Sequence, residues 1–195
     1  MPKKIMVICG SPRPKGNTNT VADWFIEAAR SAGAEVEKIN AAAMKYEGNG
    51  CTSCGGCQKI EEYRCVIDDE ATPVLARMPQ ADVLVFASPV YFFGPTAQIK
   101  PILDRTYSLF KFDPDTGKAT SPLRGKRIVL IATGAADKEG GLNLLEETFK
   151  TATEFMRCEL DTLLVPLAPA DPKEMAGRQD VRLQAVELGR KLASG

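Results

Sequence analysis

The sequence predicts an α/β protein built on a doubly wound parallel sheet. Two observations support this prediction. Short apolar runs alternate along the chain with segments of helical periodicity, and a polar loop directly follows the first run. Residues Ile5 to Cys9 form a continuous apolar run, as expected for a strand that is buried on both faces. The predicted strands cover residues 5–9, 35–40, 82–87, 127–132 and 159–167.

Helices are predicted between these strands. In the first, residues 17–32, apolar side chains recur on one face before Gly33 ends the helix. Right-handed crossovers then favour a three-layer sandwich with the flavodoxin-like strand order 2-1-3-4-5. We expect one domain over residues 1–195, with a cysteine-rich insertion at about 41–69 and a polar connection at 112–125. The remaining helices are predicted at 70–78, 96–110, 141–157 and 179–193.

Composition excludes several classes of function. The 195 residues include 25 Lys plus Arg and 25 Asp plus Glu, so no charge excess indicates nucleic acid or an anionic membrane as a partner. No run approaches membrane-spanning length and no secretory segment is evident, so we expect a cytoplasmic protein. There is no histidine, which excludes histidine-based acid–base catalysis and histidine-ligated zinc. Because no nucleophile–base pair can be assembled, hydrolase and transferase activities are disfavoured.

The loop after the first strand has the composition of a phosphate site. A helix N-terminus carries unpaired amides and partial positive charge, and this loop adds hydroxyl, amide and guanidinium donors. Simple helix capping by Asn17 or Thr18 is the alternative. Neither the nucleotide-triphosphate P-loop nor the dinucleotide glycine fingerprint is present. The predicted phosphate ligands are Ser11, Arg13, Asn17, Thr18 and Asn19.

Two further loops should meet this one at the carboxyl edge of the sheet. One contains three consecutive aromatic residues, of which at least one should face a ligand or a partner subunit, unless they pack locally over a helix. The other supplies small residues and free amides. A phosphate site, aromatic walls and backbone donors together suit FMN. The aromatic loop consists of Pro89, Val90, Tyr91, Phe92, Phe93 and Gly94, and the small-residue loop contains Thr133 and Gly134.

Three motifs in this order resemble those of the flavodoxin-like NAD(P)H-dependent FMN reductase family. They are Gly10-Ser11-Pro12-Arg13 with Gly16-Asn17-Thr18, then Ser88-Pro89-Val90-Tyr91-Phe92, and Lys100-Pro101-Ile102-Leu103-Asp104-Arg105. The resemblance implies that the first loop binds the FMN phosphate and that residues 89–94 and 133–134 contact the isoalloxazine. It also implies NAD(P)H as a donor and a homodimer or homotetramer. The charges at residues 100, 104 and 105 would lie at that interface or on a solvated face.

Four cysteines form a C-x2-C-x2-C-x7-C pattern at Cys51, Cys54, Cys57 and Cys65. Four thiolates are what a [4Fe-4S] cluster requires, although redox-active or idle thiols and a zinc site are alternatives. The spacing differs from that of bacterial ferredoxins. It resembles the compact motif of iron–sulfur flavoproteins, a branch of the same family, which implies an FMN and a [4Fe-4S] cluster. Cys9 and Cys158 should be core residues.

These observations predict an FMN-dependent redox protein that takes electrons from ferredoxin or NAD(P)H, with the cofactor supplying the bond chemistry. Such a protein needs no side-chain acid or base, in agreement with the absence of histidine. Two alternatives remain. One is a cluster-free NAD(P)H-dependent FMN or quinone reductase, and the other is a flavin-binding redox sensor without turnover.

Overall fold

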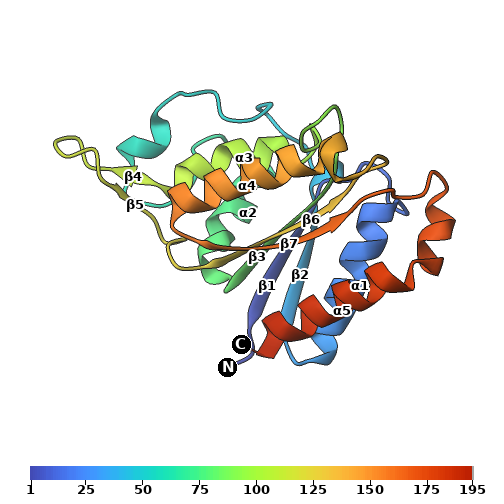
Figure 1. Ribbon diagram of the computed structural model, residues 1–195. Coiled ribbons are helices and arrows are strands. Elements are labelled where there is room, and N and C mark those ends of the chain that lie inside the picture. The colour runs from blue at the N-terminus through green and yellow to red at the C-terminus, as the bar shows by residue number, and fades with distance from the viewer. Residues whose placement is uncertain (195) are drawn as a thin grey trace.

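The computed structural model describes residues 1–194, which contain a five-stranded parallel sheet of order β2-β1-β3-β6-β7 (Figure 1). Counted along the chain, the five strands of this sheet follow the predicted order 2-1-3-4-5. The labels differ because two short strands, β4 and β5, pair outside the sheet. The sheet strands are β1 (Lys4–Cys9), β2 (Glu35–Asn40), β3 (Val83–Pro89), β6 (Arg127–Thr133) and β7 (Glu159–Val165).

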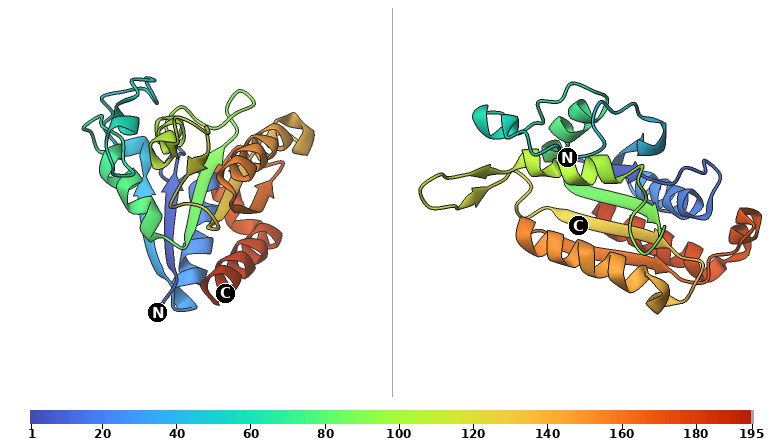
Figure 2. Two further views of the ribbon diagram at one scale, coloured as in Figure 1. Left: turned by 90° about the vertical axis from the view of Figure 1, so that its left-hand side faces the viewer. Right: turned by 90° about the horizontal axis from the view of Figure 1, so that it is seen from above.

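Helices cover both faces of the sheet, as predicted (Figure 2). One face carries α1 (Asn17–Ser31) and α5 (Gln179–Ser194), and the other carries α2 (Ala71–Arg77), α3 (Lys100–Arg105) and α4 (Leu142–Met156). Short 3-10 helices lie at Ala41–Ala43, Gly56–Lys59, Met78–Gln80, Thr106–Leu109, Lys138–Gly140 and Pro172–Gly177.

The core consists of two hydrophobic clusters, one on each face of the sheet. Side chains alternate between them along each strand, so that Met6 and Ile8 of β1 face the α2–α4 layer while Ile5 and Val7 face α1 and α5. The inner strands β1, β3 and β6 are buried along nearly their whole length. The continuous apolar runs in the sequence are therefore explained by burial on both faces.

The connection between α3 and β6 differs from the prediction. The α-helix expected at 96–110 is confined to residues 100–105, with Pro101 in its first turn and the 3-10 turn Thr106–Leu109 after it. The expected polar connection contains an antiparallel hairpin of β4 (Lys111–Phe112) and β5 (Ala119–Thr120). Its turn is held by Asp113, whose Oδ1 accepts hydrogen bonds from the backbone of Asp115 and Thr116. This hairpin projects from one end of the molecule (Figure 1).

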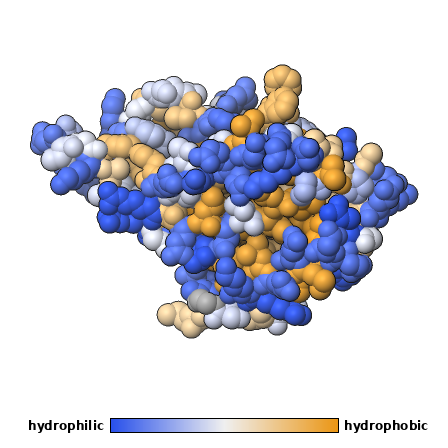
Figure 3. All heavy atoms as spheres, viewed as in Figure 1, coloured by the Kyte–Doolittle hydropathy of each residue, from blue (hydrophilic) through white to orange (hydrophobic). Residues whose placement is uncertain are grey.

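In the view of Figure 3, charged and polar residues cover most of the surface, while hydrophobic residues are visible between α4 and α5, on the side of the edge strand β7. The large apolar side chains exposed elsewhere include three consecutive residues, Tyr91, Phe92 and Phe93, in the loop after β3. Within residues 1–194, no helix combines the length and the apolar character that a membrane crossing would require.

Candidate functional site

Three predicted loops converge on one cavity at the carboxyl ends of β1, β3 and β6. The cavity has a volume of about 470 Å³. Gly10 brings two of these loops close together. A Cβ atom there would lie 2.6 Å from Ile99 Cβ, and Thr96 Oγ1 donates a 2.7 Å hydrogen bond to the Gly10 carbonyl. The lining comprises Ser11, Arg13, Gly16, Asn17, Thr18, Pro89, Val90, Tyr91, Thr133, Gly134, Ala135, Ala168, Pro169 and Ala170.

The N-terminus of α1 opens onto this cavity without a side-chain cap. Gly16 is the capping residue, and no side chain accepts a hydrogen bond from the first amides of the helix. Neither Asn17 nor Thr18 therefore caps the helix. Ser11 Oγ, which is buried, accepts a 3.3 Å hydrogen bond from the Arg13 amide and shapes the loop, while the Arg13 side chain remains exposed at the rim. This combination of free amides, a helix dipole and a guanidinium suits an anion.

Buried polar contacts join the first loop to its neighbours. Thr18 Oγ1 lies 2.7 Å from Thr133 Oγ1, which ties the start of α1 to the end of β6. Asn17 Nδ2 donates a 2.7 Å hydrogen bond to the Pro169 carbonyl, so that the loop after β7 closes one side of the cavity. The buried Oδ1 of Asn17 has no partner in the protein. This oxygen can only accept a hydrogen bond, so it suits a ligand hydroxyl better than a phosphate oxygen, while Nδ2 retains a second N–H.

Asn19 lies beneath the loop and does not line the cavity. Its Nδ2 donates hydrogen bonds to the carbonyls of Arg13 (2.8 Å) and Pro14 (3.3 Å). The side chain therefore holds the loop in shape, whereas the sequence predicts a phosphate ligand at this position.

The aromatic loop divides into a part that lines the cavity and a tip that does not. Pro89, Val90 and Tyr91 line the cavity, whereas Phe92, Phe93 and Gly94 lie outside its lining. Tyr91 and Gly94 close the turn by reciprocal backbone hydrogen bonds of 3.0 and 3.2 Å. Both phenylalanines have positive φ angles, 47° and 65°, which bulky residues rarely adopt, and Phe92 is 97% exposed. Strain and exposure together are characteristic of a segment with a contact role.

The four cysteines of the predicted motif line a second cavity, of about 360 Å³. Cys51 and Cys54 are exposed at its mouth, and Cys57 and Cys65 are buried. Hydrogen bonds from the Gly56 backbone and the Thr52 side chain lower the pKa of the Cys54 thiol. Within residues 1–194, however, no three Cys, Asp or Glu side chains are arranged so as to hold a single metal ion.

Hydrogen bonds with residues 110–112, at the start of the β4–β5 hairpin, hold residues 51–65 in place, which we call the cysteine segment. Lys111 Nζ donates hydrogen bonds to the carbonyls of Cys57 and, at 2.7 Å, Ile60. Gln58 Nε2 donates a 2.9 Å bond to the Phe110 carbonyl. The segment contains a single short helix, Gly56–Lys59, and depends on such contacts for its shape.

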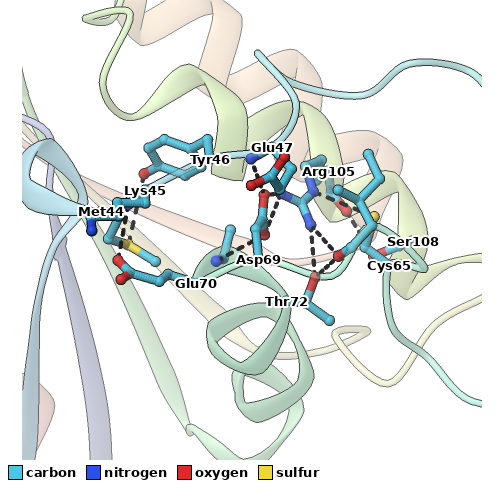
Figure 4. Close-up of polar contacts among 12 residues, drawn as sticks. Met44, Lys45, Tyr46, Glu47, Cys65, Asp69, Glu70, Thr72, Arg105 and Ser108 are labelled. Carbon is cyan, nitrogen blue, oxygen red and sulfur yellow. Dashed lines mark hydrogen bonds and ion pairs between the residues drawn. The ribbon is translucent and has the colours of Figure 1, made fainter.

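Arg105, expected at an interface or on a solvated face, is instead 1% exposed and faces the cysteine cavity (Figure 4). Its Nη1 contacts both oxygens of Asp69, at 2.8 and 2.6 Å, and its Nε lies 3.3 Å from Cys65 Sγ. Burial alone would raise the pKa of Asp69. Hydrogen bonds from Arg105 and from the Glu47 and Ala71 amides outweigh burial and hold this pKa below its usual range.

The remaining two cysteines lie outside both cavities. Cys9 is buried in β1, and burial raises the pKa of its thiol to about 11. Cys158 is partly buried and donates a 3.1 Å hydrogen bond from Sγ to the Leu123 carbonyl. Both have the surroundings of structural residues.

Residues 168–170 and Arg105 belong to these two sites although the sequence did not predict it. Residues 168–170 follow the last strand of the sheet, and the same rule that places three loops at its carboxyl edge would have included this one. No comparable signal existed for Arg105, because an arginine near the end of a helix ordinarily faces solvent.

A model of the family described as NADPH-dependent FMN reductase matches residues 3–167. The chain belongs to that family. This match confirms the family that the loop motifs predict, a family of flavin-dependent oxidoreductases.

Among solved structures, an NAD(P)H:quinone oxidoreductase from Methanothermobacter marburgensis aligns over 98% of both chains, with a TM-score of 0.72 and 16% identity. An FMN-dependent NADH-azoreductase from Bacillus anthracis, solved with FMN, covers 98% of this chain and 99% of its own (TM-score 0.70, 16% identity). These two likenesses show the fold.

Sequence relatives include several iron–sulfur flavoproteins, which supports the predicted branch. MJ1083 of Methanocaldococcus jannaschii is 40% identical over 138 residues, which cover 71% of this chain and 65% of that protein. The iron–sulfur flavoprotein of Methanosarcina thermophila is 33% identical over 106 residues, or 54% of this chain and 53% of its own length. The matched part thus spans about half to two thirds of these relatives.

Proposed function

We propose that this protein carries FMN in the first cavity and passes electrons from a reduced donor to an acceptor. The observation that carries the proposal is the convergence of an uncapped helix N-terminus, Arg13 and the Pro89–Tyr91 wall on one cavity within a family of FMN reductases. When bound, FMN would supply the electron-transfer chemistry, and the protein supplies binding and electrostatic tuning.

The residues of the first cavity fit each part of such a cofactor. The amides at the start of α1, the hydroxyl of Ser11 and the guanidinium of Arg13 would hold the phosphate. The unpartnered Oδ1 of Asn17 would accept a hydrogen bond from a ribityl hydroxyl. Residues 89–91 and 133–134 would contact the ring, and Thr18 would fix the distance between the first and third loops through Thr133. The exposed tip Phe92–Gly94 would contact the ring or a neighbouring subunit of a homodimer or homotetramer.

We further propose that Cys51, Cys54, Cys57 and Cys65 hold a [4Fe-4S] cluster. All four line one cavity, the donor set is purely sulfur, and iron–sulfur flavoproteins are among the relatives. Ser53 and Gly55 have positive φ angles of 54° and 67°, so the backbone reverses sharply between the cysteines. A cluster would make one-electron exchange with a ferredoxin natural, whereas NAD(P)H is the donor that the family name indicates.

A cluster-free reductase is the second candidate, and one observation favours it. Within residues 1–194 the cysteines are not arranged to hold a single metal ion, and two of them are exposed. In that case NAD(P)H would reduce the flavin directly, and free flavin or a quinone would be the acceptor. A flavin-binding sensor without turnover is the remaining alternative.

Anaerobic purification, with FMN, iron and sulfide quantified per chain, tests the proposal. We expect one FMN and about four irons per chain. FMN without iron, even after reconstitution with iron and sulfide, would favour the cluster-free reductase. The absence of flavin after incubation with FMN would contradict the assignment of the first cavity. Rapid bleaching of the flavin by NADPH alone would count against ferredoxin as the donor, and steady turnover with any acceptor would exclude the sensor.

A further inference from the structure

Arg105 is the largest fully buried side chain among residues 1–194, and all five of its N–H groups have acceptors. Nη1 contacts both oxygens of Asp69, and Nη2 donates to the Ile67 carbonyl (3.1 Å) and to Thr72 Oγ1 (2.7 Å). The acceptor of the fifth donor, Nε–H, is Cys65 Sγ. In Figure 4 the guanidinium lies between Asp69, Thr72 and Cys65.

This arrangement keeps the guanidinium in a fixed orientation. Asp69, whose side chain is 2% exposed, is itself held by hydrogen bonds of 3.1 Å from the amides of Glu47 and Ala71. A buried guanidinium that turned away from these acceptors would lose several charge-assisted hydrogen bonds. Its planar geometry then fixes the direction in which Nε–H points.

Cys65 is the cysteine that most needs such support. Seven residues separate it from Cys57, whereas two residues separate Cys51 from Cys54 and two separate Cys54 from Cys57. The chain between Cys57 and Cys65 contains little regular structure beyond the end of the short helix Gly56–Lys59. The position of Cys65 relative to the other three cysteines is therefore set mainly by tertiary contacts, and the contact at its sulfur is Arg105.

We propose that Arg105 is a positioning residue for Cys65, an inference that rests on the cluster assignment made above. It holds Sγ at the wall of the cavity that the four cysteines share and donates a hydrogen bond to that sulfur. A hydrogen bond to a ligand sulfur stabilises the negative charge added on reduction, so Arg105 would raise the reduction potential of a cluster held by these cysteines.

A purely structural role for Arg105 makes a different prediction. If the side chain served only to neutralise Asp69 and to join α2 to α3, its replacement would change stability and leave the potential of a correctly loaded protein unaltered. The reduction potential therefore separates the two roles.

The test compares Arg105→Lys with a paired variant, Asp69→Asn/Arg105→Gln. Lysine keeps the positive charge near Asp69 but loses the guanidinium fork, and the paired variant removes both buried charges together. Arg127→Lys is the matched control, because Arg127 also pairs with carboxylates, Asp161 and Glu159, and has no hydrogen bond to a cysteine. Each reconstituted protein is assayed for FMN, iron, melting temperature and the cluster reduction potential, followed by electron paramagnetic resonance.

For both test variants we expect a reduction equilibrium shifted about tenfold towards the oxidised form, equivalent to about 59 mV for one electron. Loss of iron with both FMN content and melting temperature retained would also support the proposal, because a purely structural role would lower the melting temperature. The control should match the wild type. If Arg105→Lys loses FMN and fails to fold, the paired variant carries the test. An unchanged potential and spectrum in loaded variants would overturn this inference alone. A wild-type protein that binds FMN but no iron would overturn the cluster assignment and this inference together.

Discussion

The two cavities are built in different ways. The first is lined by loops that leave β1, β3, β6 and β7, so its position follows from the sheet itself. The second is lined mainly by an irregular segment between β2 and α2, which Arg105 and Lys111 hold from elsewhere in the chain. Backbone topology thus sets the position of the first site, whereas long-range side-chain contacts set the position of the second.

This difference suggests that the two sites can be disrupted independently. Loops at the end of a sheet are fixed by the buried core beneath them, so a single substitution there should change ligand affinity and leave the loop in place. A segment held by a few side chains should instead lose its arrangement locally when one of those contacts is removed.

The largest effect is expected for Cys54→Ser. Cys54 is exposed at the mouth of the second cavity, so serine should fold normally but remove one of four thiolate ligands. We expect iron to fall from about four per chain to almost none while the FMN content stays unchanged. Iron analysis and the visible spectrum check this. Cys158→Ser, which alters a partly buried cysteine outside the cavity, should retain iron. Loss of FMN or of folding in Cys54→Ser would show that the two sites depend on each other.

The next effect is expected for Arg13→Ala in the first cavity. Removing the guanidinium at the rim should weaken FMN binding by about 1.5–3 kcal/mol, or roughly tenfold to a hundredfold in Kd, and leave iron content unchanged. Titration of the apoprotein with FMN, followed by fluorescence quenching, measures this change. Lys15→Ala removes a neighbouring exposed charge that does not line the cavity, and its affinity should match the wild type. An unaltered Kd in Arg13→Ala would contradict the phosphate assignment.

The two cavities also differ in how well the sequence predicts them, because one is fixed by the sheet and the other by side-chain contacts. The apolar runs placed the sheet strands to within about two residues, and the rule for open α/β sheets then brought three loops together. The roles of individual side chains within those loops were less predictable. Asn19 supports the loop from below, and Phe92 and Phe93 form a strained tip, because turn geometry and side-chain orientation depend on tertiary contacts.

The cysteine segment shows where prediction from sequence ends. The four-cysteine spacing indicated a common site, and the structure places all four around one cavity. Nothing in the local pattern indicated that Arg105 would be buried beside Cys65, or that a hairpin would form at residues 111–120 and hold the segment through Lys111. These contacts join residues far apart in the chain, and periodicity carries no information about them.

A smaller effect is expected when the contact between the first and third loops is removed. Thr18→Val leaves the buried hydroxyl of Thr133 without its partner, which should cost about 1–3 kcal/mol of stability and weaken FMN binding by a smaller factor. Chemical denaturation measures the loss. The double variant Thr18→Val/Thr133→Val removes both hydroxyls and should recover much of it. If the double variant is no more stable than the single one, the hydroxyl pair does not account for the loss.

The smallest effect on overall stability is expected for Lys111→Met. This substitution tests most directly whether side-chain contacts hold the second cavity in shape. Methionine keeps the bulk of the stem but loses the hydrogen bonds to the Cys57 and Ile60 carbonyls. Because these bonds hold an irregular segment, we expect faster amide hydrogen exchange over residues 51–65 and almost no change in melting temperature or in FMN affinity. Lys118→Met is the control, since the side chain of Lys118 makes no hydrogen bond or ion pair within residues 1–194 and is exposed near the hairpin turn. Equal exchange rates in the two variants would mean that the cysteine segment holds its own shape, and the contrast between the cavities would then lie only in their position on the fold.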